Sequence, residues 1–198
     1  LAEINKKITR EINTELPKNL VAISNKLKIH LIQISTHSIF DGYKSKIGFY
    51  ENIEPKPTSY YAKTKYQAEK NIISNCNTYT ILRLPYLFSN NLKFRSNILK
   101  KLLNDIENGL VNINKKEISS LADTNKVAKA INDIILNKAI GIYHYADQGY
   151  FNWYNLAKHA AGKLKIKISI KNNTKKSQKT FNSSLLSNYT FYSYCSWQ

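Results

Sequence analysis

The chain has 198 residues, enough for one hydrophobic core or for one core with a smaller lobe. Its two cysteines, Cys76 and Cys195, lie far apart and form no Cys-x-x-Cys pair, which argues against a disulfide framework or a metal site and predicts a reducing, cytoplasmic location. No apolar run approaches the ~20 residues that span a bilayer, and the start lacks a signal-peptide pattern, so no membrane association is expected.

The formal net charge of +17 is a usual indication of nucleic-acid binding. However, only Arg10, Arg83 and Arg95 are arginines, and the other basic residues are lysines scattered among Asn and Ile, as expected from an AT-rich genome. Arginine is the residue favoured for bidentate phosphate recognition. We therefore expect no nucleic-acid partner, although a basic nucleic-acid-binding module remains an alternative.

The first predicted elements are a helix over residues 2–28 and a strand over residues 27–35. The helix is indicated by apolar residues at spacings of three or four, with a new turn or a kink expected at Pro17. These apolar residues are Ile8, Ile12, Leu16, Leu20, Ile23 and Leu27. The strand is a β-branched, apolar run that ends abruptly in the hydroxyl residues Ser35 and Thr36, which is typical of a buried strand leading into a polar loop.

Strands and helices continue to alternate along the rest of the chain. After a loop over residues 41–59, the expected helices cover residues 59–74, 97–108, 123–136 and 153–164. The expected strands cover residues 78–84, 111–118, 141–145 and the first part of 165–180. The aromatic tail, residues 189–197, is expected to pack against the body. Alternation of this kind predicts a parallel sheet with helices on both faces and a ligand crevice at the carboxyl ends of the strands.

The helix over residues 59–74 carries Tyr61 and Lys65, which are one turn apart and therefore lie on one face. An ammonium near a phenol lowers its pKa from about 10 and makes proton transfer accessible nearer neutral pH. The same spacing also occurs at Tyr66/Lys70 and Tyr154/Lys158. Only Tyr61/Lys65 follows a strand that ends in Ser-Thr, and this context makes it the candidate catalytic pair.

Several segments together resemble the extended short-chain dehydrogenase/reductases, and most closely the dTDP-4-dehydrorhamnose reductase group. They are Ser35-Thr36-His37-Ser38-Ile39-Phe40-Asp41-Gly42, Glu54-Pro55-Lys56-Pro57, Tyr61-Ala62-Lys63-Thr64-Lys65 and Ala68-Glu69. The resemblance continues through Leu82-Arg83, Asp123, Gly141-Ile142-Tyr143-His144 and Trp153-Tyr154, so it covers most of the chain.

The resemblance implies NADP(H) or NAD(H) as the cofactor and a nucleotide-sugar as the substrate. Tyr61 would donate a proton to the developing alkoxide, and Thr36 would position the carbonyl oxygen. Lys65 would hold the nicotinamide ribose and lower the pKa of Tyr61. The residues expected to contact the cofactor are Ser35, Tyr61, Lys65 and Pro85. Those expected to contact the substrate are Thr36, His37, Ser38 and Tyr86.

Three of these positions depart from the pattern of the reductase group. His37 stands where that group usually has Asp, Ser38 where it usually has Tyr, and Tyr86 where it often has Trp. Because these positions flank the sugar nucleotide, they weaken the substrate assignment more than the family assignment. We interpret His37 as a partly exposed loop histidine rather than a proton relay, and Arg83 as a structural or phosphate-facing residue.

The glycine-rich dinucleotide fingerprint with which the family begins is absent. The chain has only six glycines, and about 34 residues precede Ser35, which is too few for several βα units. Methionine is absent even at position 1. We therefore expect either a fragment that lacks the N-terminal βα units and is inactive alone, or a degenerate, non-catalytic relative.

The expected fold is α/β, a partial Rossmann-like, doubly wound parallel sheet with a small C-terminal substrate-binding lobe. Residues 1–90 would form the C-terminal part of an NAD(P)-binding domain. Residues 91–198 would form mainly the substrate-binding lobe, with residues 119–147 returning to the sheet.

The expected function is NAD(P)H-dependent reduction of a nucleotide-linked 4-keto sugar, in dTDP-rhamnose and cell-surface polysaccharide biosynthesis. Alternatives are a sugar-nucleotide epimerase or dehydratase of the same family, or a non-catalytic regulatory subunit resembling that of methionine adenosyltransferase. The resemblance also allows a homodimer.

Overall fold

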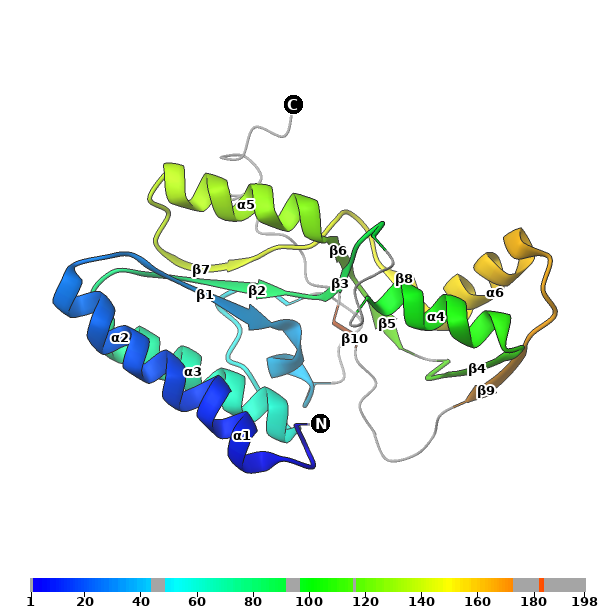
Figure 1. Cartoon of the computed structure of the whole chain (residues 1–198), viewed down its shortest axis with the longest axis horizontal. Helices are drawn as coiled ribbons and strands as arrows, with labels where there is room; N and C mark the ends of the chain where they lie inside the picture. The colour runs from blue at the N-terminus through cyan, green and yellow to red at the C-terminus, as the bar shows by residue number, and fades with distance from the viewer. Residues whose placement is uncertain (1, 44–48, 92–96, 116, 173–181, 184–198) are drawn as a thin grey trace.

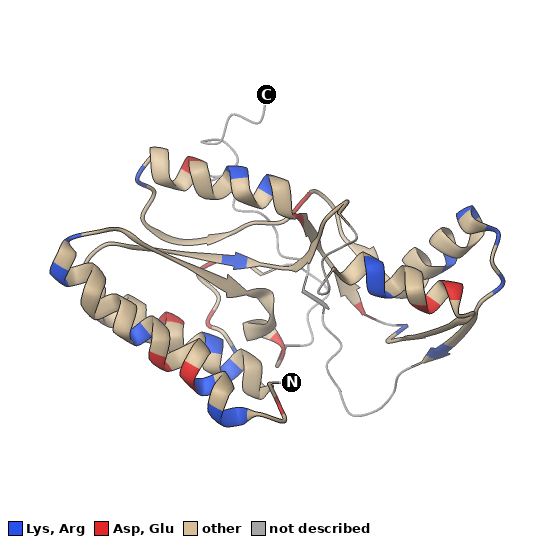
Figure 2. Cartoon of the chain, in the orientation of Figure 1, with Lys and Arg blue, Asp and Glu red and all other residues tan. Residues whose placement is uncertain are grey.

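The computed structural model describes residues 2–43, 49–91, 97–115 and 117–172, together with the backbone of residues 182–183. The aromatic tail that was expected to pack against the body lies outside the described residues. Figure 2 shows Lys and Arg scattered over the helices of the described chain, with Asp and Glu between them on several helices.

The main sheet has three parallel strands in the order β1 (Leu31–Thr36), β2 (Tyr79–Leu84) and β7 (Gly141–His144). Leu31 lies opposite Tyr79 and Thr80 lies opposite Gly141. Helix α3 (Tyr60–Asn75) and the N-terminal helix cover one face, and α5 (Thr124–Leu136) covers the other (Figure 1). Because parallel strands need crossover connections, this arrangement follows from the alternation of strands and helices, and the predicted α/β fold is confirmed.

The N-terminal helix runs as α1 (Lys6–Arg10), one π-helical turn η1 (Glu11–Glu15) and α2 (Leu16–Leu27). The wide turn lies just before Pro17, whose missing N–H cannot continue the ladder, and the Leu16 N–H bonds the Glu11 carbonyl. The apolar stripe predicted for this helix does not face the core. Pro17, Val21 and Ser24 are buried instead, because they form the side that meets α3 and β2.

Side-chain caps fix the starts of the other long helices. Ser59 caps α3, Asn97 caps α4 (Ile98–Glu107), and Asp123 caps α5. Asn152 caps α6 (Trp153–Leu164). Each accepts a hydrogen bond from a first-turn N–H that would otherwise have no partner, which stabilises the start of the helix.

The second region is a small lobe built on α4 and α6. It contains the parallel pair β4 (Leu110–Ile113) and β9 (Ser169–Asn172), and a sheet in the order β10 (Asn182–Ser183), β5 (Ile118–Ser119) and β8 (Phe151–Asn152). The single strand predicted over residues 111–118 is therefore two strands, β4 and β5. The buried residues of its core are Leu102, Ile106, Val111, Trp153, Ala157 and Ala161.

The two regions meet where Pro85 separates β2 from β3 (Tyr86–Phe88). Strand β3 pairs in parallel with β6 (Leu121–Asp123), which leads into α5 and so back to β7 in the main sheet. The crossing places the carboxyl ends of β1 and β2 beside the lobe (Figure 1). The division of the chain into two domains stays a prediction.

Candidate active site

The carboxyl end of β1 is fixed by the residues that follow it. The Thr36 hydroxyl accepts a hydrogen bond from the Ser38 N–H at 3.1 Å and so caps the 3-10 turn η2 (His37–Phe40). Ile39 and Phe40 in this turn are fully buried. Thr36 is thus held at the end of the strand with its side chain almost covered.

Asp41 links this end of β1 to the start of α3 through hydrogen bonds. One carboxylate oxygen accepts hydrogen bonds from the Thr58 N–H and hydroxyl, and the other accepts from the Ser59 N–H at 3.0 Å and hydroxyl at 2.6 Å. Partial burial acts to raise the pKa of Asp41, but the bonds from Ser59 and Thr58 outweigh it and lower the pKa. At the adjacent Gly42, a Cβ would lie 2.3 Å from the Lys56 carbonyl oxygen, so only glycine allows this close approach.

As a result, Tyr61 meets Thr36. The Tyr61 phenol lies beside the Thr36 hydroxyl, and 38% of Tyr61 remains exposed. Burial raises the pKa of Tyr61 and the neighbouring Thr36 hydroxyl opposes this, with a net upward shift. The predicted lowering of this pKa by Lys65 is therefore wrong for this structure.

Lys65 lies one turn after Tyr61, as predicted, but its ammonium is engaged elsewhere. Its Nζ donates to the backbone carbonyl of Ile34 in β1 at 2.7 Å. Burial lowers the pKa of Lys65, and the nearby Glu69 carboxylate opposes this. The ammonium is thus bound to β1, and the two effects on the pKa of Tyr61 are burial, which is the larger, and the Thr36 hydroxyl.

Behind the pair lies a buried chain of ionic hydrogen bonds. The Arg83 guanidinium donates to the Glu69 carboxylate at 2.7 Å from Nη2 and at 3.2 Å from Nε. The exposed fractions of these side chains are 2% and 0%. The Ser35 hydroxyl donates to the same carboxylate. A cofactor contact by the Ser35 side chain would have to break this bond, whereas the structural interpretation of Arg83 agrees with its burial.

His144 extends this chain with a defined tautomer. Its Nδ1 lies 3.0 Å from the Phe49 carbonyl oxygen, so Nδ1 carries the proton, and Nε2 accepts from Arg83 Nη1 at 3.2 Å. Burial, helped by the Arg83 charge, lowers the pKa of His144 to about 3. Neither His144 nor Glu69 was assigned a role from the sequence. The signal available was an arginine inside the apolar strand Ile81-Leu82-Arg83-Leu84, which requires a buried partner.

The predicted substrate residues His37 and Tyr86 also meet. Their rings are 4.9 Å apart in an edge contact, and His37 Nδ1 lies 3.2 Å from the Leu84 carbonyl oxygen. The interpretation of His37 as a partly exposed histidine is wrong, because η2 folds it inward and leaves 3% exposed. Burial lowers its pKa to about 4, against the opposing effects of Leu84 and Asp41.

Tyr86 continues into a pocket of about 200 Å³ in the lobe. Glu117 accepts hydrogen bonds from the Tyr86 hydroxyl at 3.2 Å and from the Trp153 indole at 3.1 Å. Burial raises the pKa of Glu117, and these two bonds oppose it. Glu117 was not predicted, since only the tertiary structure places it beside Tyr86. Ser38 is half-buried and Pro85 is buried between β2 and β3.

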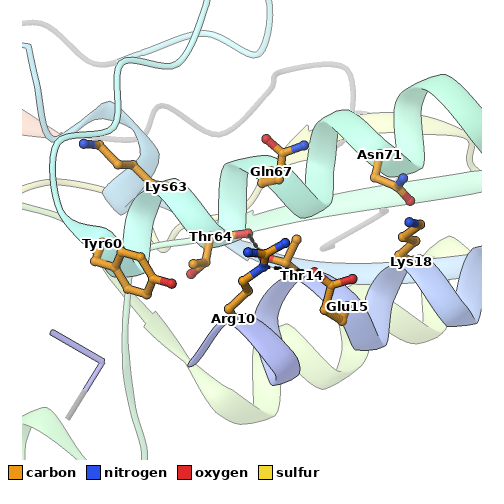
Figure 3. Close-up of a pocket in the computed structure, with 9 residues that line it drawn as sticks. All are labelled: Arg10, Thr14, Glu15, Lys18, Tyr60, Lys63, Thr64, Gln67 and Asn71. Carbon is orange, nitrogen blue, oxygen red and sulfur yellow. Dashed lines mark hydrogen bonds and ion pairs between the residues drawn. The ribbon is translucent and has the colours of Figure 1, made fainter. Parts of the chain in front are cut away.

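A larger pocket, about 480 Å³, lies between the N-terminal helix and α3 (Figure 3). Its lining includes Arg10, Lys18, Lys63, Thr64 and Gln67. The α3 residues among them stand on a different side of the helix from Tyr61 and Lys65, so this pocket is separate from the candidate chemistry. In the described part of the chain, no cluster of His, Cys, Asp or Glu is placed to hold a metal ion, and no helix there could cross a membrane.

Comparison with known proteins gives a consistent family match. The model of the RmlD substrate binding domain matches residues 1–190. The chain is 28% identical over 133 residues to methionine adenosyltransferase 2 subunit beta of Danio rerio, covering 64% of this chain and 41% of that protein. It is 24% identical over 156 residues to dTDP-4-dehydrorhamnose reductase of Sinorhizobium fredii, covering 75% and 51%. The chain thus spans about half the length of the curated relatives it matches.

Solved structures show the same fold. A dTDP-4-dehydrorhamnose reductase from Clostridium acetobutylicum is similar with a TM-score of 0.81 at 25% identity, covering 95% of this chain and 67% of that one. The Bacillus anthracis dTDP-4-dehydrorhamnose reductase in complex with NADP gives 0.81 at 23% identity, covering 95% and 68%. The dTDP-glucose 4,6-dehydratase of Bacillus anthracis in complex with NAD gives 0.79 at 12% identity, covering 96% and 63%.

Proposed function

Because this chain belongs to the RmlD substrate binding domain family, within the extended short-chain dehydrogenase/reductases, we propose that it contributes the catalytic pair of a nucleotide-sugar reductase. The substrate would be a nucleotide-linked 4-keto sugar. The observation that carries the proposal is the Tyr61 phenol beside the Thr36 hydroxyl at the carboxyl end of β1, with Lys65 one turn further along the same face of α3.

The residues fit one end of a dinucleotide. A phenol and an ammonium on one helix face suit a nicotinamide ribose, whereas no glycine-rich phosphate cradle occurs in the sequence. When bound, NADPH or NADH supplies the hydride. Lys65 would hold the ribose after leaving the Ile34 carbonyl, and we expect the 198-residue chain alone to be inactive.

Tyr61 is suited to act as the acid in such a reduction. A phenol has an ordinary pKa of about 10 and is therefore protonated at neutral pH, which is the form that donates a proton to an alkoxide. Burial, by raising the pKa of Tyr61, makes it a weaker acid, so the catalytic role would need a cation brought close to the phenol. The Thr36 hydroxyl, held in place by the Ser38 N–H, would orient the carbonyl oxygen towards that phenol. The His37–Tyr86 edge contact supports a role for both in the wall of the sugar site.

The test is the reduction of dTDP-4-dehydrorhamnose by the protein translated from the whole reading frame, followed as NADPH oxidation. Tyr61→Phe keeps the ring and removes the proton, so turnover should fall roughly a hundredfold or more. Tyr66→Phe is the matched control. It removes the phenol of the second Tyr-x-x-x-Lys pair, whose hydroxyl bonds Glu54 instead, and should leave turnover unchanged.

A second candidate function is a non-catalytic regulatory subunit, favoured by the match to methionine adenosyltransferase 2 subunit beta. Under this hypothesis the site residues serve only as scaffold. Near-wild-type turnover in Tyr61→Phe, or no turnover of the unmodified protein, would favour it over the reductase.

A further inference from the structure

Tyr86 lies between the candidate site and the small lobe. It is the first residue of β3, and its ring makes edge contacts on two sides. The ring centroids are 4.9 Å apart for His37 and 5.4 Å apart for Trp153. Aromatic pairs tolerate centroid distances of about 4.5–7 Å, so these contacts alone would allow the ring several positions. A further contact is needed to fix one of them.

Glu117 supplies that contact. Its Oε1 accepts hydrogen bonds from the Tyr86 hydroxyl at 3.2 Å and from Trp153 Nε1 at 3.1 Å. A carboxylate oxygen has two lone pairs, so one atom can accept both bonds. Because the two rings also contact each other, Tyr86, Glu117 and Trp153 form a closed triangle of contacts.

The backbone of Glu117 is fixed as well as its side chain. Its carbonyl accepts from the Trp153 N–H at 3.4 Å and from Asn152 Nδ2 at 3.1 Å, where helix α6 begins. Its N–H donates to the Asn114 carbonyl at 3.2 Å. The acceptor that binds the Tyr86 hydroxyl is therefore attached to the lobe by backbone hydrogen bonds.

The position of Tyr86 matters because its other contact, His37, directly follows Thr36. The Thr36 hydroxyl lies beside the Tyr61 phenol at the carboxyl end of β1. His37 is 3% exposed and its Nδ1 lies 3.2 Å from the Leu84 carbonyl oxygen, so it would not follow a displaced ring. A shift of Tyr86 would therefore change the wall beside the candidate site and leave Thr36 and Tyr61 in place.

A simpler role for Glu117 is to satisfy the two ring donors, because buried polar groups need partners. Phenylalanine at position 86 would fill the same space with no donor to satisfy, so this role does not explain the hydroxyl and its acceptor together. A half-buried carboxylate also costs free energy. Among the residues that the structure describes, Glu117 forms no ion pair to offset this cost. The arrangement is explained if the position of the ring itself matters.

We propose that Glu117 is a positioning residue for the sugar site, acting through the Tyr86 hydroxyl to hold the Tyr86 ring against His37. The identity of the ligand rests on the proposed function, and the new element is that a residue of the lobe controls how well the sugar is bound. Loss of the Glu117–Tyr86 bond should weaken binding of the nucleotide sugar and leave the proton-transfer step unchanged.

The kinetic test uses the reductase assay described above. Glu117→Leu should raise the KM for dTDP-4-dehydrorhamnose roughly tenfold and change kcat by less than about threefold. Glu117→Gln keeps an oxygen that accepts both bonds, so its KM should stay within about threefold of the unmodified protein. A merely structural role would lower the unfolding temperature without separating KM from kcat. An unchanged KM in Glu117→Leu, or an equal loss in kcat, would overturn the proposal.

Tyr86→Phe breaks the same bond from the other side and keeps the ring, and it decides the question if Glu117→Leu does not fold. It should raise KM by a similar factor. Because both changes remove one bond, the double variant should be no worse than either single variant, whereas independent effects would multiply. The control is Asp105→Asn, which neutralises another carboxylate lining the same pocket and should leave KM unchanged. Multiplied effects, or a similar rise in the control, would overturn the proposal.

The position of the ring can be measured without turnover. Proton NMR of the His37 ring reports the ring current of Tyr86, and Glu117→Leu and Tyr86→Phe should each reduce that shift by roughly half or more, whereas Glu117→Gln should preserve it. Unchanged His37 signals in both variants would overturn the proposal, even in a protein that reduces no sugar. A reduced shift in such a protein would leave the positioning of Tyr86 by Glu117 standing and remove only the proposed function.

Discussion

The ionic chain between α3 and the main sheet and the apolar stripe of the N-terminal helix lie on the same face of the sheet, yet their surroundings differ. Ser35, Glu69, Arg83 and His144 bond one another and are at most 5% exposed. The side chains of the stripe, from Ile8 to Leu27, are 38% to 59% exposed. The difference indicates that the buried chain holds β1, β2, β7 and α3 together, whereas the stripe adds little to the packing of the described residues.

The largest effect should come from breaking the interior chain at Arg83. Arg83→Met leaves the buried Glu69 carboxylate without its cation and should lower the free energy of unfolding by about 3–5 kcal/mol in urea denaturation. The control is Lys126→Met, which removes the cation of the exposed Lys126–Asp147 pair at 3.3 Å. That change should cost about 0–1 kcal/mol. Equal costs would show that the interior chain is no stronger than a surface pair.

Acid should weaken the protein through its two most deeply buried histidines. The pKa of His144 is lowered to about 3 and that of His37 to about 4, so both stay neutral when folded but gain a proton when unfolded below pH 6.5. Their contribution is complete above pH 6.5 and is lost as pH falls towards these values. The free energy of unfolding should fall by up to about 1.4 kcal/mol per pH unit for each histidine.

Urea denaturation between pH 6.5 and 5 measures this loss, in a range where Asp41, with its lowered pKa, stays ionised. His144→Gln should reduce the slope by about half. An unchanged slope in that variant would contradict the assignment of His144 as a buried neutral histidine.

The smallest effects on the free energy of unfolding are expected from apolar substitutions on the two sides of α2. Val21 is 4% exposed and Ile23 is 50% exposed, two residues apart. In the 198-residue chain, Val21→Ala should cost about 2 kcal/mol of unfolding free energy, and Ile23→Ala less than about 0.5 kcal/mol. Thermal denaturation of the two variants gives the comparison. Equal costs would contradict the difference in burial between the two sides of α2.

Local patterns determined much of the fold. The β-branched run indicated β1, although the strand starts at Leu31 and not at Leu27, which belongs to α2. The helix expected over residues 59–74 is α3, Tyr60–Asn75, one residue later at each end. The spacing of Tyr61 and Lys65 put both on one side of α3, since that depends only on helical geometry.

Tertiary structure decided what those side chains contact. Sequence periodicity marked the stripe of the N-terminal helix as apolar, but burial depends on which neighbours are present, and here α3 and β2 meet Val21 instead. His37 is likewise buried only because η2 folds it inward. Glu117, which comes just before β5, meets Tyr86 of β3 although the two are 31 residues apart in the sequence. Lys65 bonds Ile34 because β1 is an edge strand among the described strands, and no local pattern predicts which strand lies at an edge.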